Sequence, residues 1–246
     1  MLHLHRKKES IVRTGWCFLF GFIILSQSIS AQRAELNLFD HDNKPYYFGI
    51  TLGANLARFQ TDLHSRFLLY DSVYVAEPAN SGGLTLGLLA TARVSNRFQV
   101  RFNPQLMFIE RSLLYKLKYP DFNGETDVVK KVESVTVAFP LQLKFQSDRI
   151  GNFRVYMMAG IKGEIDLASN ARAKRAEDLV KINKFDYGPE LGLGFNFYFP
   201  SFILSPEIKI SNGLNNIHSR DENLKYSNVL DKIYSRMIVF SIHIEG

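Results

Sequence analysis

The sequence predicts an all-β protein: an eight-stranded antiparallel transmembrane β-barrel behind a cleavable export signal. Two observations predict it. Eight segments alternate between apolar and polar residues with a period of two, and the connections between them are alternately long and short. This alternation gives each strand one apolar and one polar face. Alternately long and short connections are typical of barrels that cross the bacterial outer membrane.

The first 31 residues have the features of a secretory signal peptide. Four basic residues precede an apolar stretch over 15–25, and a polar segment of mostly small residues follows. A membrane-spanning helix needs roughly 20 apolar residues, so the short stretch favours cleavage over a retained anchor. We expect residues 1–31 to be removed, residues 32–45 to form a periplasmic N-terminal segment, and residues 46–246 to form the barrel.

Composition excludes several classes of chemistry. Cys17 is the only cysteine and lies in the expected signal, so the mature chain has no disulfide, cysteine–metal site or cysteine nucleophile. The whole chain has a formal charge of +6, but without residues 1–31 it has 26 basic and 23 acidic residues, or +3. This small excess, without a basic helix or an RNA-binding motif, predicts no nucleic-acid partner.

The first four expected strands alternate clearly. The segments 48–56 and 84–94 place Leu, Ile and Ala on one face and mainly Gly, Thr and Asn on the other. The segment 98–108 places Phe and Val opposite Gln, Arg and Asn, and 134–145 places Val, Phe and Leu opposite Ser, Thr, Gln and Lys. A tilted strand crosses a bilayer with roughly 9 to 11 residues, which these segments provide.

The last four strands follow the same rule with one weaker member. The segment 154–162 is the least regular, because it has methionines on both faces. The segment 190–199 places Leu and Phe opposite Glu, Gly and Asn, 202–211 places Phe, Leu and Ile opposite Ser, Glu and Lys, and 238–244 places Ile and Phe opposite Ser and His. The small residues of the polar faces suit a narrow lumen better than the water-facing exterior of a soluble barrel.

The lengths of the connections predict the cellular location and the orientation of the barrel. Short turns lie at 95–96, 146–152 and 200–201, whereas the other connections, including a first loop over 59–81, have about 15 to 25 residues. In outer-membrane barrels the short turns are periplasmic and the long loops extracellular. The sequence therefore predicts a multi-pass protein in the outer membrane of a Gram-negative bacterium, with outer-membrane lipid or lipopolysaccharide as a partner.

Aromatic residues gather where the short turns meet the strands. Bulky rings prefer the bilayer interface, so the cluster predicts a periplasmic girdle, although ordinary core aromatics at strand ends are an alternative. The expected girdle residues are Tyr46, Tyr47, Phe48, Phe98, Phe145, Phe153, Phe199 and Phe202.

Four prolines lie inside the expected strands: Pro104, Pro140, Pro189 and Pro206. A proline removes a hydrogen-bond donor from the ladder between strands. We expect these residues to mark bulges or frayed rims.

The inward-facing ionic residues predict a plugged lumen. An eight-stranded barrel of the OmpA or OmpX size leaves an interior just wide enough for side chains to fill, so a conducting pore is not expected. Buried ions need partners, and we expect Glu190 and Glu207, on adjacent strands, to pair with lumen Arg or Lys residues. The expected structural network is Arg93, Arg101, Lys144, Arg154, Lys162, Glu190 and Glu207, with Glu164 on the same face.

Two loop segments are candidates for contact with partners. The apolar residues Phe67, Leu68, Leu69 and Tyr70 could form a partner surface or pack as a loop core. The segment 172–175 is basic and precedes two acidic residues. It either forms a solvated face of mixed charge or attracts phosphorylated lipid headgroups.

The histidines do not form an evident active site. His64 and His218 each precede a serine, and adjacent residues of an extended strand point to opposite faces, which is poor geometry for a base and its nucleophile. No metal-ligand spacing, phosphate-binding loop or dinucleotide motif is present. We expect no catalytic residue, cofactor, metal or small-molecule substrate.

Five motifs carry a resemblance to a known family: 47–55 (YFGITLGAN), 66–68 (RFL), 71–73 (DSV), 82–87 (GGLTLG) and 101–106 (RFNPQL). With them the mature chain resembles the PorT-type outer-membrane β-barrel proteins of Bacteroidetes, which belong to the type IX secretion and gliding machinery. The resemblance implies a non-enzymatic accessory role, as scaffold or assembly factor rather than conduit, beside other outer-membrane or periplasmic secretion proteins. The alternatives are a stand-alone structural or adhesin-like barrel and, third, a lipid-modifying enzyme.

Overall fold

The computed structural model describes residues 35–65, 73–120, 124–169, 181–220 and 225–246. Residues 36–246 form one compact unit, and it alone is described below. The expected signal peptide, the apolar loop segment Phe67–Tyr70 and the basic segment 172–175 lie outside the described residues.

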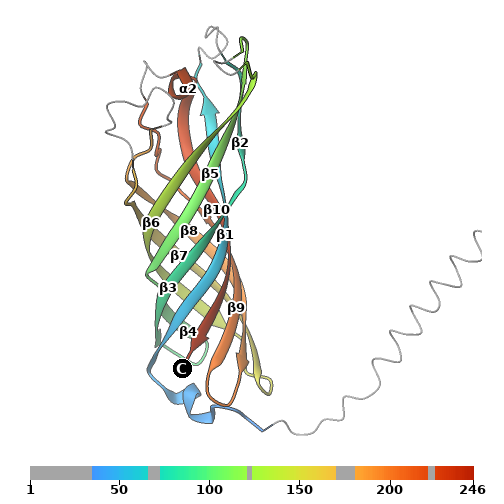
Figure 1. The fold of residues 1–246 in the computed structure, drawn as a ribbon. Helices are drawn as coiled ribbons and strands as arrows, with labels where there is room; N and C mark the ends of the chain where they lie inside the picture. Colours follow the sequence, from blue (N-terminus) through green and yellow to red (C-terminus); the bar gives the residue numbers. More distant parts are fainter. Residues whose placement is uncertain (1–34, 66–72, 121–123, 170–180, 221–224) are drawn as a thin grey trace, which may run out of the picture. The chain divides into compact units, whose positions relative to one another are not determined.

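Ten antiparallel strands form one closed sheet (Figure 1). Two strand positions of the barrel are interrupted. β2 (Val73–Ala79) continues the line of β3 (Ser81–Arg93) along β5 (Gln105–Leu117), and β4 (Phe98–Phe102) leads into β5 across Asn103 and Pro104. The other strands are β1 (Tyr46–Leu63), β6 (Asp127–Gln146), β7 (Phe153–Asp166), β8 (Phe185–Tyr198), β9 (Ile203–Asn212) and β10 (Leu230–Glu245).

The sheet closes because β1 pairs with β3 on one side and with β10 on the other. Ten strands thus occupy eight positions in up-and-down order, which confirms the predicted eight-stranded barrel. The connections 94–97, 147–152 and 199–202 lie at one end, here called the turn end, and the longer connections lie at the opposite loop end. Among the described residues, two short helices accompany the strands: η1 (Phe39–Asn43) and α2 (Lys225–Asn228). In the part of the chain that is described, no helix has the length and hydropathy to cross a membrane.

The strands extend further toward the loop end than the alternation predicted. In β1 the outward residue changes from Leu56 to Arg58, while the inward residue changes from Asn55 to Phe59. The strand continues, but its chemistry inverts: beyond Leu56 the apolar side chains face the interior. An apolar-outside criterion therefore ends a strand at the inversion, although the backbone ladder continues to Leu63.

Two expectations about the loops were wrong for this reason. The first loop does not cover 59–81, because Phe59 is buried inside the barrel and β2 lies within that range. The connections 64–72 and 118–126 are accordingly shorter than the predicted 15 to 25 residues.

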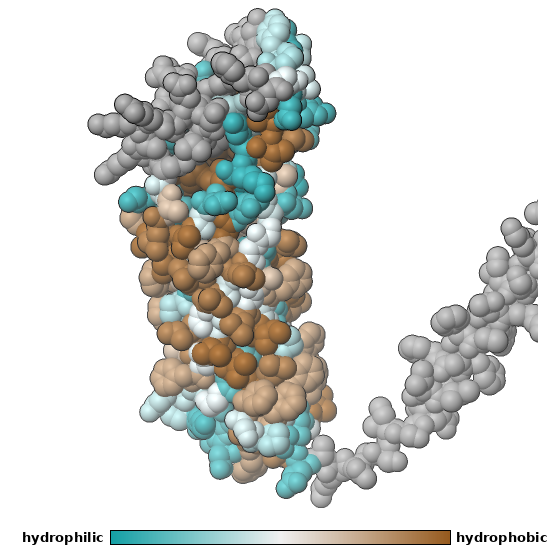
Figure 2. Space-filling model, in the orientation of Figure 1, coloured by the Kyte–Doolittle hydropathy of each residue, from teal (hydrophilic) through white to brown (hydrophobic). Residues whose placement is uncertain are grey.

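Figure 2 shows an apolar band on one face of the barrel between its two ends, and exposed apolar side chains occur on the other strands as well. Outward side chains in this band are open to the surroundings, as Leu84 and Leu88 are at 62% and 66% exposure. Exposed apolar area of this extent is typical of a surface covered by lipid.

The aromatic cluster at the turn end lies largely on the outer face. Phe98 contacts Phe145 with ring centroids 5.1 Å apart, and Phe199 contacts Phe202 at 5.0 Å. Tyr47 is the exception and was assigned wrongly: it points into the barrel and is buried, because it has the opposite parity to Tyr46.

The prolines lie where a ladder is interrupted, not at frayed rims. Pro104 separates β4 from β5, and Pro140 lies opposite this break and accepts a hydrogen bond from the Asn103 amide at 3.2 Å. Pro206 lies in the gap of the β8–β9 ladder, while its pairing with Ile242 of β10 is intact. Pro189 is paired with β7 but lies just beyond the β9 ladder. β6, β8 and β9 continue past their prolines because the ladder on the other side of each strand is complete, whereas both ladders are interrupted at Pro104.

Apolar side chains fill the loop end of the barrel. Tyr115 contacts Tyr226 of α2 with ring centroids 4.9 Å apart and donates a hydrogen bond to its carbonyl oxygen at 3.1 Å. This loop-end core contains Phe59, Val73, Ala76, Leu113, Tyr115, Leu117, Ile182, Ile217, Tyr226, Val229, Leu230 and Ile233.

We expect Leu113→Ala to lower the free energy of unfolding by about 2 to 5 kcal/mol, because it leaves a cavity in this core. The same change at Leu214, which is 60% exposed in a loop, should cost less than about 1 kcal/mol. Urea unfolding in lipid vesicles, followed by gel mobility, measures both. Equal losses would contradict a packed loop-end core.

Candidate functional site

A buried ion cluster occupies the middle of the lumen. Arg101 of β4 donates hydrogen bonds to Glu207 of β9 at 2.8 Å and to Glu245 of β10 at 3.0 Å. All three side chains are completely buried. The His243 imidazole lies 3.3 Å from the other carboxylate oxygen of Glu207, so one carboxylate joins three strands.

Tyr156 connects this cluster to the neighbouring wall. Its hydroxyl donates to Glu207 Oε2 at 2.7 Å, and the Lys144 ammonium lies 3.9 Å from the centroid of its ring. Lys144 also reaches Asn196 Oδ1 at 3.4 Å. The ring therefore offsets part of the lysine's desolvation through a cation–π contact.

A second pair lies beside the first. Glu190 accepts a hydrogen bond from Gln142 at 2.8 Å and lies 3.5 Å from Lys209 of β9. Lys209 in turn lies 3.4 Å from the amide oxygen of Gln105. Each of these ions has more than one polar contact, which buried ions require.

The turn end of the lumen is closed by the N-terminal segment. Asp42 of η1 accepts from Arg154 at 3.1 Å and from Arg149 at 3.2 Å, and Arg93 lies 4.0 Å away. Arg149 also donates to the Asn37 carbonyl, and its guanidinium lies 3.7 Å from the centroid of the Tyr198 ring. Three arginines from the barrel rim thus hold one carboxylate.

His41, next to Asp42, seals the same opening. Its ring packs on Tyr47 with centroids 4.5 Å apart, and neither ring nitrogen has a hydrogen-bond partner among the described residues. Burial lowers the pKa of His41 to about 4, against a smaller opposing effect of Glu245. The docked ring is therefore neutral at physiological pH.

A third group of ions lies nearer the loop end. Lys162 pairs with Glu164, two residues further along β7, and both side chains are buried. Arg111 of β5 donates to Ser235 of β10 at 3.0 Å across the lumen. Between this level and the mid-lumen ions lies a small apolar cluster of Ala57, Met107, Ile109, Ala138, Met237 and Val239.

The structure divides the residues that the sequence placed in one network. Arg101 and Glu207 pair directly, Glu190 pairs with Lys209, and Lys162 pairs with Glu164. Arg93 and Arg154 lie instead at the turn-end mouth, because they occupy the last inward positions of their strands, where Asp42 is the available acid.

Sequence reasoning missed several members of these clusters. Lys209 and His243 lie on faces that the alternation had already identified as polar, and Glu245 continues the parity of His243. Tyr156 likewise has inward parity on β7. No sequence pattern indicated Asp42, because its segment does not alternate between apolar and polar residues.

Among the described residues, His218 and His243 each lie close to a serine that is not adjacent to it in sequence. His243 Nε2 lies 3.4 Å from Ser241 Oγ, and both side chains are buried in the lumen. His218 Nε2 lies 2.9 Å from Ser227 Oγ, and its Nδ1 faces the backbone carbonyl of Asp231 at 3.3 Å. Burial lowers the pKa of His218, which keeps the ring neutral. Ser227 is 0% exposed, so its hydroxyl cannot reach a substrate in this structure. The contact fixes α2 on the loop-end core rather than forming an accessible nucleophile.

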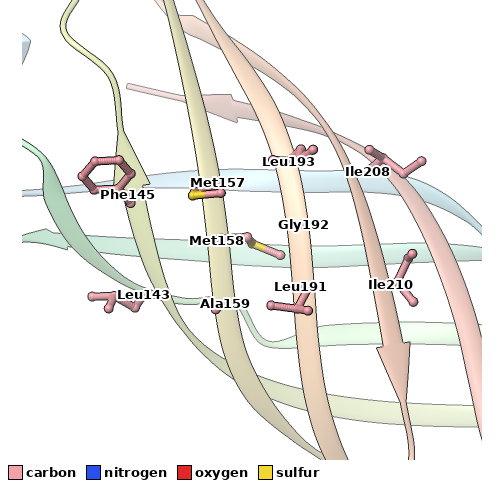
Figure 3. Close-up of a pocket in the computed structure, with 10 residues that line it drawn as sticks. All are labelled: Leu143, Phe145, Met157, Met158, Ala159, Leu191, Gly192, Leu193, Ile208 and Ile210. Atoms are coloured by element: carbon pink, nitrogen blue, oxygen red, sulfur yellow. The ribbon is translucent and has the colours of Figure 1, made fainter.

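No group of three or more possible metal ligands occurs within the described ranges. The outer wall has a pocket of about 590 Å³ in the apolar band, shown in Figure 3. Ala159 leaves this hollow among the larger side chains of Leu143, Phe145, Met157, Leu191, Leu193, Ile208 and Ile210, and the inward-facing Met158 and Gly192 also line it.

We expect Arg101→Gln to lower the free energy of unfolding by about 3 to 5 kcal/mol, because two buried carboxylates lose their partner. The control is Arg97→Gln at the turn end, whose pair with Asp148 at 2.9 Å is exposed and should contribute less than about 1 kcal/mol. Urea titration of both proteins in the same vesicles makes the comparison. Similar stability of the two variants would contradict the assigned role of Arg101.

We expect the N-terminal segment to dock less tightly at pH 5 than at pH 7.5. Released His41 binds a proton below its ordinary pKa of 6.5, whereas docked His41 does so only below about 4. Within this window docking should weaken about tenfold per pH unit as the pH falls. Hydrogen-exchange protection factors of the His41 and Lys44 amides measure docking, since both donate to carbonyls of the segment. In His41→Phe the dependence should disappear, and an unchanged dependence there would assign it to another group.

Comparison with known proteins identifies the family. A model of the family described as "Outer membrane protein beta-barrel domain" matches residues 27–219. Comparison with curated proteins gives no significant match. The distantly similar solved structures include the following three, all with TM-scores below 0.5.

Neisserial surface protein A is 12% identical, with a TM-score of 0.38 over 80% of this chain and 96% of that one. OprG from Pseudomonas aeruginosa is 14% identical, with a TM-score of 0.43 over 80% of this chain and 94% of that one. Ail of Yersinia pestis is 10% identical, with a TM-score of 0.36 over 82% of this chain and 100% of that one. The assignment rests on the family model, which matches well over half of the sequence: the chain belongs to the outer membrane protein beta-barrel domain family, and it is a protein of the outer membrane.

Proposed function

We propose that this barrel is a non-enzymatic accessory component of the type IX protein secretion and gliding machinery, acting as a scaffold or assembly factor. The observation that carries the accessory role is the filled lumen. Arg101, Glu207 and Glu245 meet at its centre with no exposed side-chain surface. A barrel with ions packed across its middle is unsuited to pass a polypeptide, so its function lies at its outer surfaces, loops or turn end.

The assignment to type IX secretion is supported by the sequence motifs that resemble PorT-type proteins. Two of these motifs, 47–55 and 101–106, meet in the lumen, where the Thr51 hydroxyl donates to the Asn103 side chain at 3.1 Å. Their residues therefore maintain the barrel interior. The secretion role itself rests on the resemblance.

We also propose roles for the two N-terminal segments of the chain. Residues 1–31 are removed as a signal peptide, and residues 32–45 remain as a periplasmic segment. Support comes from Asp42, whose contacts with Arg149 and Arg154 hold the end of this segment in the turn-end mouth.

We expect deletion of the gene to remove outer-membrane-exported proteins from the culture medium and to retain them in the cell. Quantitative proteomics of medium and cell fractions measures this, and the wild-type gene should restore secretion. Ser227→Ala should restore it equally, because this hydroxyl is completely buried and has no catalytic role in a scaffold.

Each alternative has its own outcome in the same strains. Unchanged secretion would overturn the secretion role. Altered lipid acylation in the deletion strain, uncorrected by Ser227→Ala, would instead support a lipid-modifying enzyme. Loss of surface attachment alone would support an adhesin-like barrel.

A further inference from the structure

The barrel wall has a gap near the loop end. β1 pairs with β3 from Tyr46 only as far as Ala57, which lies opposite Ser81. Beyond this point β2 takes the place of β3, but β2 pairs with β5, and no ladder joins it to β1 within the described strands. The β1 edge from Arg58 to Leu63 is therefore paired only with β10.

A cleft of about 790 Å³ occupies this gap. It is lined on its apolar side by outward residues such as Leu56 and Ile238 and by inward residues such as Phe59 and Ala76. Unlike the entirely apolar pocket in Figure 3, this cleft also has charged residues on its rim.

Two arginines stand side by side at the mouth of the cleft. Arg58 of β1 and Arg236 of β10 are direct cross-strand partners, and both are exposed on the outer face. Like charges in this arrangement destabilise a sheet. Among the described residues neither arginine pairs with a carboxylate, and the polar contact of Arg236 is with Asn212 Oδ1 at 3.2 Å. The pair therefore presents an uncompensated double positive charge.

The height of the pair on the barrel indicates the chemistry of its ligand. Toward the turn end the outer face continues with Leu56 and Ile238, the upper edge of the apolar band. Toward the loop end it continues with Gln60, then with Asp62 opposite Lys232. In an outer-membrane protein this boundary is the level of the outer-leaflet headgroups. Two adjacent guanidinium groups match a phosphate, which each can bind through two parallel hydrogen bonds.

We propose that this place is a binding site for a phosphorylated, acylated lipid of the outer leaflet. Arg58 and Arg236 hold the phosphate, and one acyl chain enters the cleft between β1 and β2. Charge and shape together select the occupant: the arginines need an anion, and the apolar lining needs a hydrocarbon chain attached to it. The inference depends on the outer-membrane location and is independent of the secretion role.

The test measures lipid retained by the purified full-length mature barrel in detergent, by native mass spectrometry. The probes are lipid A, dephosphorylated lipid A and inorganic phosphate. The wild-type protein should retain lipid A, and the double variant Arg58→Gln with Arg236→Gln should retain at least tenfold less. Arg97→Gln, which removes an exposed arginine at the turn end, is the matched control and should retain as much as wild type. Heat-modifiable gel mobility shows that each variant is folded.

The remaining measurements test the phosphate-binding arginines and the apolar cleft separately. Dephosphorylated lipid A should be retained about as weakly by wild type as lipid A is by the double variant. Millimolar inorganic phosphate should not displace lipid A. Ala76→Leu, which narrows the cleft, should reduce lipid A retention.

Three results would overturn the proposal. One is equal retention by wild type and the double variant, and another is equal retention of the phosphorylated and dephosphorylated lipids. The third is displacement of lipid A by millimolar inorganic phosphate, which would leave only an anion site.

Discussion

The structure depends on the pairing of ions enclosed by the barrel wall. Arg101 projects from β4 into a space without solvent, where a guanidinium is costly unless carboxylates surround it. Glu207 and Glu245 supply them from β9 and β10, across the lumen. Tyr156 of β7 then donates to the Glu207 carboxylate, so the pairing also determines how the neighbouring wall packs. A closed interior follows from this arrangement, because these side chains cross the full width of the lumen.

An inversion of chemistry along β1 and β5 divides this side of the barrel into two parts. Toward the turn end, ions lie inside and apolar residues outside, as expected of a wall in lipid. Toward the loop end, Phe59 and Leu113 lie inside, while Arg58 and Gln60 face outward, as in a soluble β-barrel. The same strands therefore have a lipid-facing pattern toward the turn end and a water-facing pattern toward the loop end. The arginine pair and the cleft lie where the two parts meet, which is the level at which a lipid headgroup and its chain require different surroundings.

Both ends of the lumen are closed by segments outside the barrel wall. At the loop end α2 places Tyr226 on the apolar core, and His218 fixes the helix through Ser227. At the turn end Asp42 anchors the N-terminal segment on the rim arginines. A barrel closed in this way can act on other molecules only through its outer wall, loops and turn-end surface, which is where a scaffold or assembly factor would make its contacts.

The sequence by itself determined the number of strand positions, the turn end and the direction in which most side chains point. Those properties are local: alternation within a segment decides parity, so the residue pattern alone assigns Arg101 and Glu207 to the interior. It did not determine which ions meet, since Arg101 and Glu245 are 144 residues apart and their contact depends on the register between strands. Nor did it determine the length of β1 or the role of Asp42. Only the closed sheet decided these, because closure fixes the register of all strands together and sets which side chains face one another across the lumen.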